Sequence, residues 1–284
     1  MEALSPQHIL CPVDFSETSA LGLRFAAALA RCSGAKLTVL YADQFLPPAY
    51  FTHDHLEEIS TRLAGAKAEA EQSLGEFVRR VAGLSEIPMS ARVIEALPVD
   101  GIIRVTGELP ADIIAMGTHG RSGFNRLMLG SVTERVLRTS SIPVLTVRPG
   151  RHGPEPFPSV RNVVCPVNNS GSARRALGYA ARLSHCLGAE LTVLHVREPG
   201  ARDGIDDLCA WIPEETRKMC SVREVTRQGE AAQVIISAAV ESSCDLLVLG
   251  ARHRTFFDST VIGTTSVRVV RHAPCAVLTV PVMN

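Results

Sequence analysis

The sequence lacks an excess of charge of either sign, because 29 Lys and Arg residues balance 29 Asp and Glu residues in a chain of 284. Such a chain creates no overall field that would draw it to nucleic acid or to an anionic membrane surface. It also lacks an apolar run long enough to cross a bilayer. The first ten residues include Glu2 and Pro6 and no apolar stretch typical of a signal peptide. We therefore expect neither nucleic acid nor a membrane as a partner.

Closely spaced cysteines are absent as well. None of the eight cysteines lies two to four residues from another, so the spacing of a zinc finger or a CxxC motif does not occur. Cys11, Cys165, Cys244 and Cys275 lie in or beside apolar runs, where free cysteine acts as a small hydrophobic residue. These features predict reduced thiols and a cytoplasmic protein.

The chain contains two copies of one pattern. "ILCPVDFS" from residue 9 returns as "VVCPVNNS" from residue 163, and "GAKLTVLY" returns as "GAELTVLH" at the same offset of 154 positions. Later matches, such as "ADIIAMG" from residue 111 and "CDLLVLG" from residue 244, are only 133 positions apart. The second copy therefore lacks 21 residues between its second and third strands.

We predict two tandem domains, residues 1–148 and 159–284, joined by a Pro- and Gly-rich linker at 149–158. The second domain has a shortened middle. The missing residues could leave one face of its sheet uncovered near Trp211, as a dimer surface or an apolar pocket.

Each copy alternates apolar runs with helical patterns. The runs lack polar alternation, which is typical of strands covered on both faces, and this predicts an α/β fold with a doubly wound parallel sheet and helices on both faces. The first helix is expected from about Ser16 to Cys32, with Gly34 as its C-cap. A second, amphipathic helix is expected within residues 56–81. The strands of the first copy are expected near residues 8–13, 37–42, 90–96, 111–116 and 143–148.

Glycines follow the fourth of these strands in the pattern Gly117-x2-Gly120-x9-Gly130-Ser131. Glycine permits close approach to the backbone, and the N-terminus of a helix can receive phosphate oxygens, so the loop is either a plain connection or a phosphate site. Ligands of doubly wound sheets bind where the strand order reverses, which would place Asp14 opposite these glycines. The pattern is neither GxGxxG nor GxxxxGK[ST].

This glycine pattern, with "CPVDFSETS" near the start and "SIPVLTV" after it, closely resembles the ATP-binding branch of the universal stress proteins. The resemblance covers nearly the whole chain as two copies. It implies five-stranded sheets in the order 3-2-1-4-5, ATP with or without Mg²⁺ as the ligand, and dimers formed through the last strand. A tandem chain could satisfy that pairing internally, as a pseudo-dimer of 143–148 with 275–280; a homodimer of whole chains is the alternative.

Carried over residue by residue, the resemblance also implies a binding site in the first domain. It places adenosine beside Pro12, Val13 and Asp14, adenine beside Ala42 where the family usually has Val, and the nucleoside under Met116 and Gly117. It places the phosphates around Gly120, Gly130, Ser131, Val132 and Thr133.

Several of these residues also have simpler interpretations. "SVTE" is a capping box in which Ser131 and Glu134 satisfy the start of a helix without a ligand, although this leaves Gly117 and Gly120 unexplained. Asp14 alone is typical of a solvated loop carboxylate.

Basic side chains offer weaker signals. His119 could contact phosphate or be an ordinary loop histidine, and Arg121 and Arg126 could contact phosphates or lie on the surface. His53 and His55 have a spacing that zinc tolerates, but no third ligand is evident, so we predict no metal site.

The second copy departs from the pattern. Asn168 replaces Asp14, and His253 stands where the second loop glycine should be, whereas Gly250 and Gly263-Thr264 remain. We expect this second site to be degenerate and not to bind ATP.

No catalytic residues are predicted. Phosphoryl transfer needs a nucleophile, a metal carboxylate and a charge clamp, and neither a P-loop lysine nor a nucleophile elbow is present. We favour an ATP-binding stress-response regulator that signals through occupancy, with at most weak ATPase activity. A slow ATP hydrolase or adenylating enzyme, or a nucleotide-free pseudo-dimeric scaffold, is the alternative.

Overall fold

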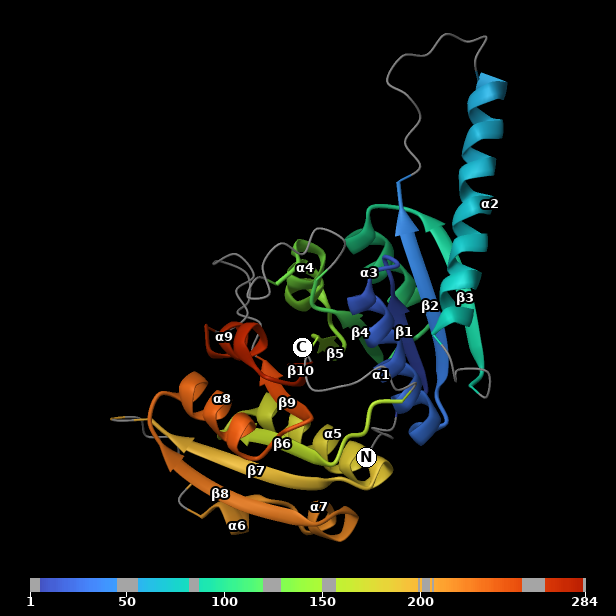
Figure 1. Ribbon diagram of the computed structural model, residues 1–284. Coiled ribbons are helices and arrows are strands. Elements are labelled where there is room, and N and C mark those ends of the chain that lie inside the picture. The colour runs from blue at the N-terminus through green and yellow to red at the C-terminus, as the bar shows by residue number, and fades with distance from the viewer. Residues whose placement is uncertain are drawn as a thin grey trace.

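The computed structural model describes residues 6–44, 56–81, 87–119, 129–149, 157–198, 200, 205, 207–251 and 264–282. In these ranges the chain forms one ten-stranded sheet with helices on both faces (Figure 1). Within the same ranges, no helix combines the length and the apolar character that crossing a bilayer requires.

The first half of the chain contributes five strands and four helices to the described structure. They are β1 (His8–Pro12), α1 (Glu17–Ser33), β2 (Lys36–Asp43), α2 (Leu56–Arg80), β3 (Met89–Glu95), α3 (Pro98–Glu108), β4 (Ile113–Gly117), α4 (Ser131–Thr139) and β5 (Val144–Val147).

The second half repeats this order with a different middle. Its described elements are β6 (Asn162–Val167), α5 (Gly171–Leu187), β7 (Glu190–Arg197), α6 (Leu208–Trp211), α7 (Glu214–Met219), β8 (Val222–Gln228), α8 (Ala231–Glu241), β9 (Leu246–Ala251), α9 (Thr264–His272) and β10 (Ala276–Pro281).

The strand order of the sheet is β3-β2-β1-β4-β5-β10-β9-β6-β7-β8. The predicted order 3-2-1-4-5 is confirmed in the first half, and the second half runs through its own five strands in the same way. Neighbouring strands are parallel within each half, but β5 and β10 pair antiparallel, with Leu145 opposite Leu278. The two expected five-stranded sheets are therefore continuous with each other through the pairing of β5 with β10.

Local signals in the sequence account for helix α1. The Ser16 side chain accepts a hydrogen bond from the backbone N–H of Ser19 at 3.1 Å and caps the N-terminus. Gly34 ends the helix with φ of 73°, a left-handed conformation that glycine adopts without strain. The predicted position of this helix and its glycine C-cap are confirmed.

Strand side chains alternate between two apolar layers, as the pleat of a strand requires. Ile9 and Cys11 of β1 pack in the layer that contains α1, α2 and α5, whereas Leu10 packs in the layer of α3, α4, α8 and α9. Leu74 and Phe77 bury the apolar side of α2 in the first layer. Helices on both faces, predicted from strands without polar alternation, are confirmed.

The uncovered face expected near Trp211 does not exist. The short helices α6 and α7 pack in this region, and Ile205, Leu208 and Ile212 are buried in the core. The Arg174 guanidinium lies 4.6 Å from the centroid of the Trp211 ring. These residues replace the long helix that the second copy lacks, so the prediction of a dimer surface or an apolar pocket at this face was wrong.

The prediction of reduced thiols was also wrong for one pair of cysteines. Cys32 and Cys186 form a disulfide. Each lies in the last turn of its helix, α1 or α5, and the two helices contact each other. Spacing along the sequence could not reveal the pair, because the two positions meet only when the halves join. Cys11 and Cys165 are free and buried, as expected.

Polar contacts also join the halves on the other face of the sheet. The Arg148 guanidinium, which follows β5, donates to the carbonyl oxygens of Val270 and Arg271 at 2.9 and 2.7 Å, at the end of α9. Arg271 in turn lies 3.4 Å from the Glu134 carboxylate of α4. Side chains of one half thus satisfy the last carbonyl groups of a helix in the other.

Candidate functional site

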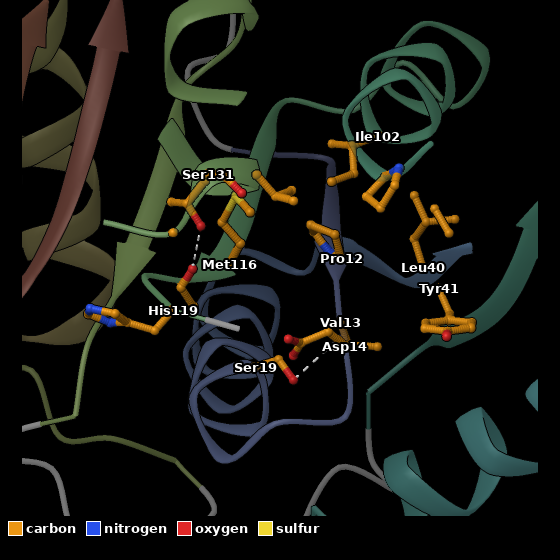
Figure 2. Close-up of a pocket in the computed structure, with 16 residues that line it drawn as sticks. Pro12, Val13, Asp14, Ser19, Leu40, Tyr41, Ile102, Met116, His119 and Ser131 are labelled. Carbon is orange, nitrogen blue, oxygen red and sulfur yellow. Dashed lines mark hydrogen bonds between the residues drawn. The ribbon is translucent and has the colours of Figure 1, made fainter. Parts of the chain in front are cut away.

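A cavity of about 310 Å³ lies in the first half, at the carboxyl ends of β1, β2 and β4 (Figure 2). From β1 the chain continues to β2 on one side, and from β4 it continues to β5 on the other side. The connections that leave β1 and β4 therefore diverge and leave a crevice between them. Gly120 lies outside the described residues. Every predicted binding residue that the structure does describe lines this cavity: Pro12, Val13, Asp14, Ala42, Met116, Gly117, Gly130, Ser131, Val132 and Thr133.

Asp14 is half-buried at the edge of the cavity and organises the turn between β1 and α1. Its Oδ1 accepts hydrogen bonds from the backbone N–H of Ser16 at 3.1 Å and from Ser16 Oγ at 2.6 Å. In the second half, Asn168 Oδ1 accepts a similar bond from Ser170 Oγ at 2.5 Å. The turn therefore needs an acceptor oxygen at this position but not a negative charge.

Tyr41 belongs to the cavity wall, although its sequence context did not single it out. Its hydroxyl donates to Asp43 Oδ2 at 2.7 Å, and its ring centroid lies 4.5 Å from that of Phe15. Phe15 has φ of 66°, a strained conformation for a residue other than glycine. It packs against Tyr41 and, at 5.6 Å, against Phe77 of α2. Figure 2 shows Tyr41 and Leu40 on the side of the cavity opposite His119 and Ser131.

Gly117 is required by packing, whether or not a ligand binds. A Cβ at this position would lie 2.8 Å from both the backbone carbon and oxygen of Thr18 in α1. Gly250 of the second half is in the same situation, since its Cβ would lie 2.6 Å from the backbone carbon of Ser172. In the sequence analysis, Gly117 had no explanation unless a phosphate approached its backbone. The structure corrects this interpretation, because the group that lies close to Gly117 is the first turn of helix α1.

Helix α4 begins at the cavity without a side-chain cap. Its N-cap is Gly130, and the carboxylate of Glu134 pairs with Arg138 at 2.6 Å and with Arg271 at 3.4 Å. The predicted capping box of Ser131 and Glu134 is therefore not formed, because the glutamate is held by arginines. The first backbone N–H groups of a helix carry partial positive charge, and here they lie at the cavity wall.

Two hydrogen bonds fix this helix start against the end of β4. Thr133 Oγ1 donates to the Gly117 carbonyl oxygen at 2.9 Å, and the Gly130 N–H donates to the Thr118 carbonyl oxygen at 2.8 Å. The position of α4 relative to the cavity is thus set by the fold itself.

The remaining wall is mostly apolar. It is formed by residues of β2 and α3 that the motif did not contain: Leu40, Pro98 and Ile102. Ile102 is buried and lies one turn after Pro98, near the start of α3. The signal that could have identified these residues is the topology, because the crossover helix before β4 must pass beside the point where the strand order reverses.

The basic candidates are only partly described. His119 lines the cavity, and its Nδ1 lies 2.8 Å from Thr118 Oγ1. Arg121, Arg126, His53 and His55 lie outside the described residues. Among the residues that are described, no group of three or more His, Cys, Asp or Glu side chains could hold a metal ion.

A second cavity of about 310 Å³ lies at the equivalent place in the second half. Asn168 and Gly250 line it as Asp14 and Gly117 line the first, and Val196 takes the place of Ala42. The Glu198 carboxylate also lies in its wall and accepts a hydrogen bond from the Ala231 N–H at 3.1 Å. His253 and Gly263 are outside the described residues. The second cavity thus keeps its volume and one carboxylate, but that carboxylate belongs to Glu198 after β7 instead of the residue that follows β6.

Comparisons with known proteins agree with the repeat. A family model described as "Universal stress protein family" matches residues 6–148 and 159–281. A universal stress protein of Methanocaldococcus jannaschii is 29% identical over 140 residues, covering 49% of this chain and 81% of that protein. The crystal structure of a universal stress protein from Archaeoglobus fulgidus is 25% identical and covers 97% of this chain and 98% of that one, with a TM-score of 0.71. A universal stress protein solved in complex with cAMP is 24% identical over 50% of this chain and 97% of that one, with a TM-score of 0.37.

Proposed function

The chain belongs to the universal stress protein family, and we propose that its first half binds an adenine nucleotide, ATP, in the cavity beside Asp14. The observation that carries this proposal is the cavity wall, which combines an apolar side, a carboxylate and the uncapped start of α4. Adenosine is apolar on its ring faces and polar at its ribose, and the phosphates are anionic, so each part meets a matching surface.

The size of the cavity supports a nucleotide as the ligand. A volume of about 310 Å³ lies at the lower end of the range typical of small-molecule pockets. The adenine is proposed to lie between Leu40, Ala42 and Ile102, with the ribose hydroxyls at Asp14. A carboxylate accepts hydrogen bonds from both ribose hydroxyls, which an amide does less well.

The phosphate groups are proposed to lie at the start of α4. Ser131, Val132 and Thr133, the first residues of α4, line the cavity next to Gly130. Gly120 is proposed as a further loop position at the phosphates. Anions are favoured at the N-terminus of a helix by its exposed N–H groups and its dipole. Any Mg²⁺ would accompany the phosphates.

The second half is proposed not to bind ATP. Its cavity carries the neutral Asn168 where the first has Asp14, and it adds the Glu198 carboxylate. The ribose hydroxyls would lose the charged acceptor that Asp14 provides in the first half. Glu198 does not replace it, because its carboxylate accepts the Ala231 N–H at the start of α8. We therefore propose one ATP per chain.

We propose that the protein is a stress-response regulator that signals through occupancy of this one site. In this account residues 1–148 form the nucleotide domain, residues 159–284 form its partner in an internal pseudo-dimer, and 149–158 link them. A cytoplasmic location and a homodimer of whole chains stay predictions. Release of ADP in the presence of Mg²⁺ would instead favour a slow hydrolase.

Asp14→Asn tests the role of the carboxylate. We expect it to lower the affinity for ATP at least about tenfold, because a charge-assisted hydrogen bond is replaced by a neutral one. The melting temperature should stay within roughly 2 °C of wild type, since Asn168 supports the equivalent turn in the second half. Isothermal titration calorimetry and thermal unfolding measure the two quantities.

The matched control is Asn168→Asp, which restores the carboxylate in the second cavity. It should leave the affinity of the first site unchanged. Wild-type protein that binds no adenine nucleotide would end the proposal. An unchanged affinity of the Asp14→Asn variant for ATP would show that the Asp14 carboxylate does not contribute to binding. The cavity would then still be the proposed binding place.

A further inference from the structure

The disulfide joins equivalent positions of the two repeats. Cys32 and Cys186 are 154 residues apart, which is also the offset between "ILCPVDFS" and its second copy. Their Cα atoms are 5.5 Å apart, within the range that a disulfide requires. The same position of the repeat, present once in each half of the chain, thus supplies both cysteines of the bond.

The pairing of the two halves brings these positions together. Antiparallel pairing of β5 with β10 relates the halves by an approximate two-fold axis, so a residue near that axis meets its own counterpart. Helices α1 and α5 contact each other on this side of the sheet. Nearby, the Arg31 guanidinium lies 3.9 Å from the centroid of the Phe157 ring, which fixes the chain as it enters the second half.

Exposure separates this pair from the four described cysteines that are buried, Cys11, Cys165, Cys244 and Cys275. Cys32 and Cys186 are both partly exposed, so reagents in solution can reach them. Cys11 and Cys165 are fully buried, and burial raises the pKa of each thiol well above its usual range. Cys220 is partly exposed like the pair, although burial still raises the pKa of its thiol. The fully buried thiols react slowly, because the thiolate is the reactive form.

We propose that Cys32 and Cys186 form a reversible redox-modification site that locks the two halves of the chain together. In the forward reaction with a small-molecule disulfide, one cysteine thiolate attacks a reagent sulfur, forms a mixed disulfide and releases one thiolate. The second cysteine then attacks the bonded sulfur of the first and releases the other thiolate. The protein loses two protons and two electrons, and the reagent is reduced to two thiols. Excess thiol reverses both steps.

The lock would act on the two helices that border the cavities. Ser19 of α1 lines the first cavity, and Ser172 of α5 lines the second. The bond constrains a loop of 154 residues in the unfolded chain, and long loops give large stabilisation in the chain-entropy description. The β5–β10 pairing does not depend on the bond, so the reduced protein should remain folded. Reduction should lower the melting temperature by roughly 10 °C.

The test uses the full chain incubated with oxidised or with reduced glutathione, followed by alkylation with N-ethylmaleimide. Trypsin releases Cys32 in residues 32–36 and Cys186 in residues 183–197. Mass spectrometry should find these two peptides joined after oxidised glutathione and separately alkylated after reduced glutathione. Alkylation of both cysteines after oxidation would overturn the proposal. So would a bond that excess reduced glutathione does not open in the folded protein.

Serine variants connect the bond to stability. In Cys32→Ser and in Cys186→Ser, the melting temperature should no longer depend on the glutathione ratio. Cys220→Ser is the matched control and should keep the full redox-dependent shift, because Cys220 lies outside the pair. An undiminished shift in both variants of the pair would contradict the proposal. These measurements do not involve nucleotide, so they test the redox site independently of ATP binding.

Discussion

Replacing Ala42 with phenylalanine should lower the affinity for ATP by roughly 100-fold or more, which corresponds to about 2.7 kcal/mol. Ala42 lies on β2 in the apolar wall of the first cavity. Helix α3 is close behind it, since a Cβ at Gly101 would lie only 3.1 Å from the Ala42 Cβ. A larger side chain can therefore extend only into the cavity, where it occupies the space proposed for adenine. Calorimetric titration measures the loss.

The matched control is Val196→Phe, which places phenylalanine at the equivalent position of the second cavity. It should leave both the affinity and the number of bound nucleotides as in wild type. If Val196→Phe weakened binding while Ala42→Phe did not, the nucleotide would have to be assigned to the second half. Comparing the two variants also separates a local block from general damage, because both place phenylalanine at the same position of the repeat.

Gly117→Ala should destabilise the protein by about 2–3 kcal/mol. The added Cβ would lie 2.8 Å from the backbone carbon and oxygen of Thr18, so the first turn of α1 must move away from β4. Ser16, the N-cap of that turn, bonds Asp14, so the ATP affinity should fall together with the stability. Denaturant unfolding measures the free energy change, provided that the m-value stays constant.

Gly107→Ala serves as the control for this substitution. Gly107 lies in α3, and a Cβ there would have no atom within 4 Å. The change should stabilise the protein by about 0.5–1 kcal/mol, since alanine is the better helix former. Equal stability of Gly117→Ala and wild type would show that α1 can shift at no cost, and the packing explanation of this glycine would be wrong.

Much of the fold was predictable because the repeat and the apolar runs are local features. Strands buried on both faces produce unbroken apolar segments, and the serine and glycine at the ends of α1 mark its boundaries directly. The offset between the copies then identified the two halves. The order of the first five strands came from the family resemblance and not from these local patterns.

Features that depend on long-range contacts were missed. The disulfide joins positions 154 residues apart, and no local spacing indicates it. Glu134 has the spacing of a capping box, but Arg271 of the other half and Arg138 hold its carboxylate instead. The short helices around Trp211 have no counterpart in the first copy, so comparing the repeats could not show that they cover the sheet.

The cavity residues also divide into those that local sequence identified and those that only long-range packing brings to the site. Residues in the motif, such as Asp14 and Ser131, were identified from the sequence and do lie at one cavity. Tyr41 and Ile102 were missed because each reaches the cavity only through the way that β2 and α3 pack beside β1. The sequence also could not separate the two reasons for a glycine, ligand approach and helix packing, which the Thr18 contact resolves at Gly117.

The number of ATP molecules bound per chain tests the central claim most directly. Titration of the wild-type 284-residue chain, freed of any nucleotide that copurifies with it, gives this stoichiometry by calorimetry. We predict one ATP per chain, bound at the cavity beside Asp14. Two per chain would show that Asn168 and Glu198 do not prevent binding in the second half, and none would contradict nucleotide binding by this protein altogether.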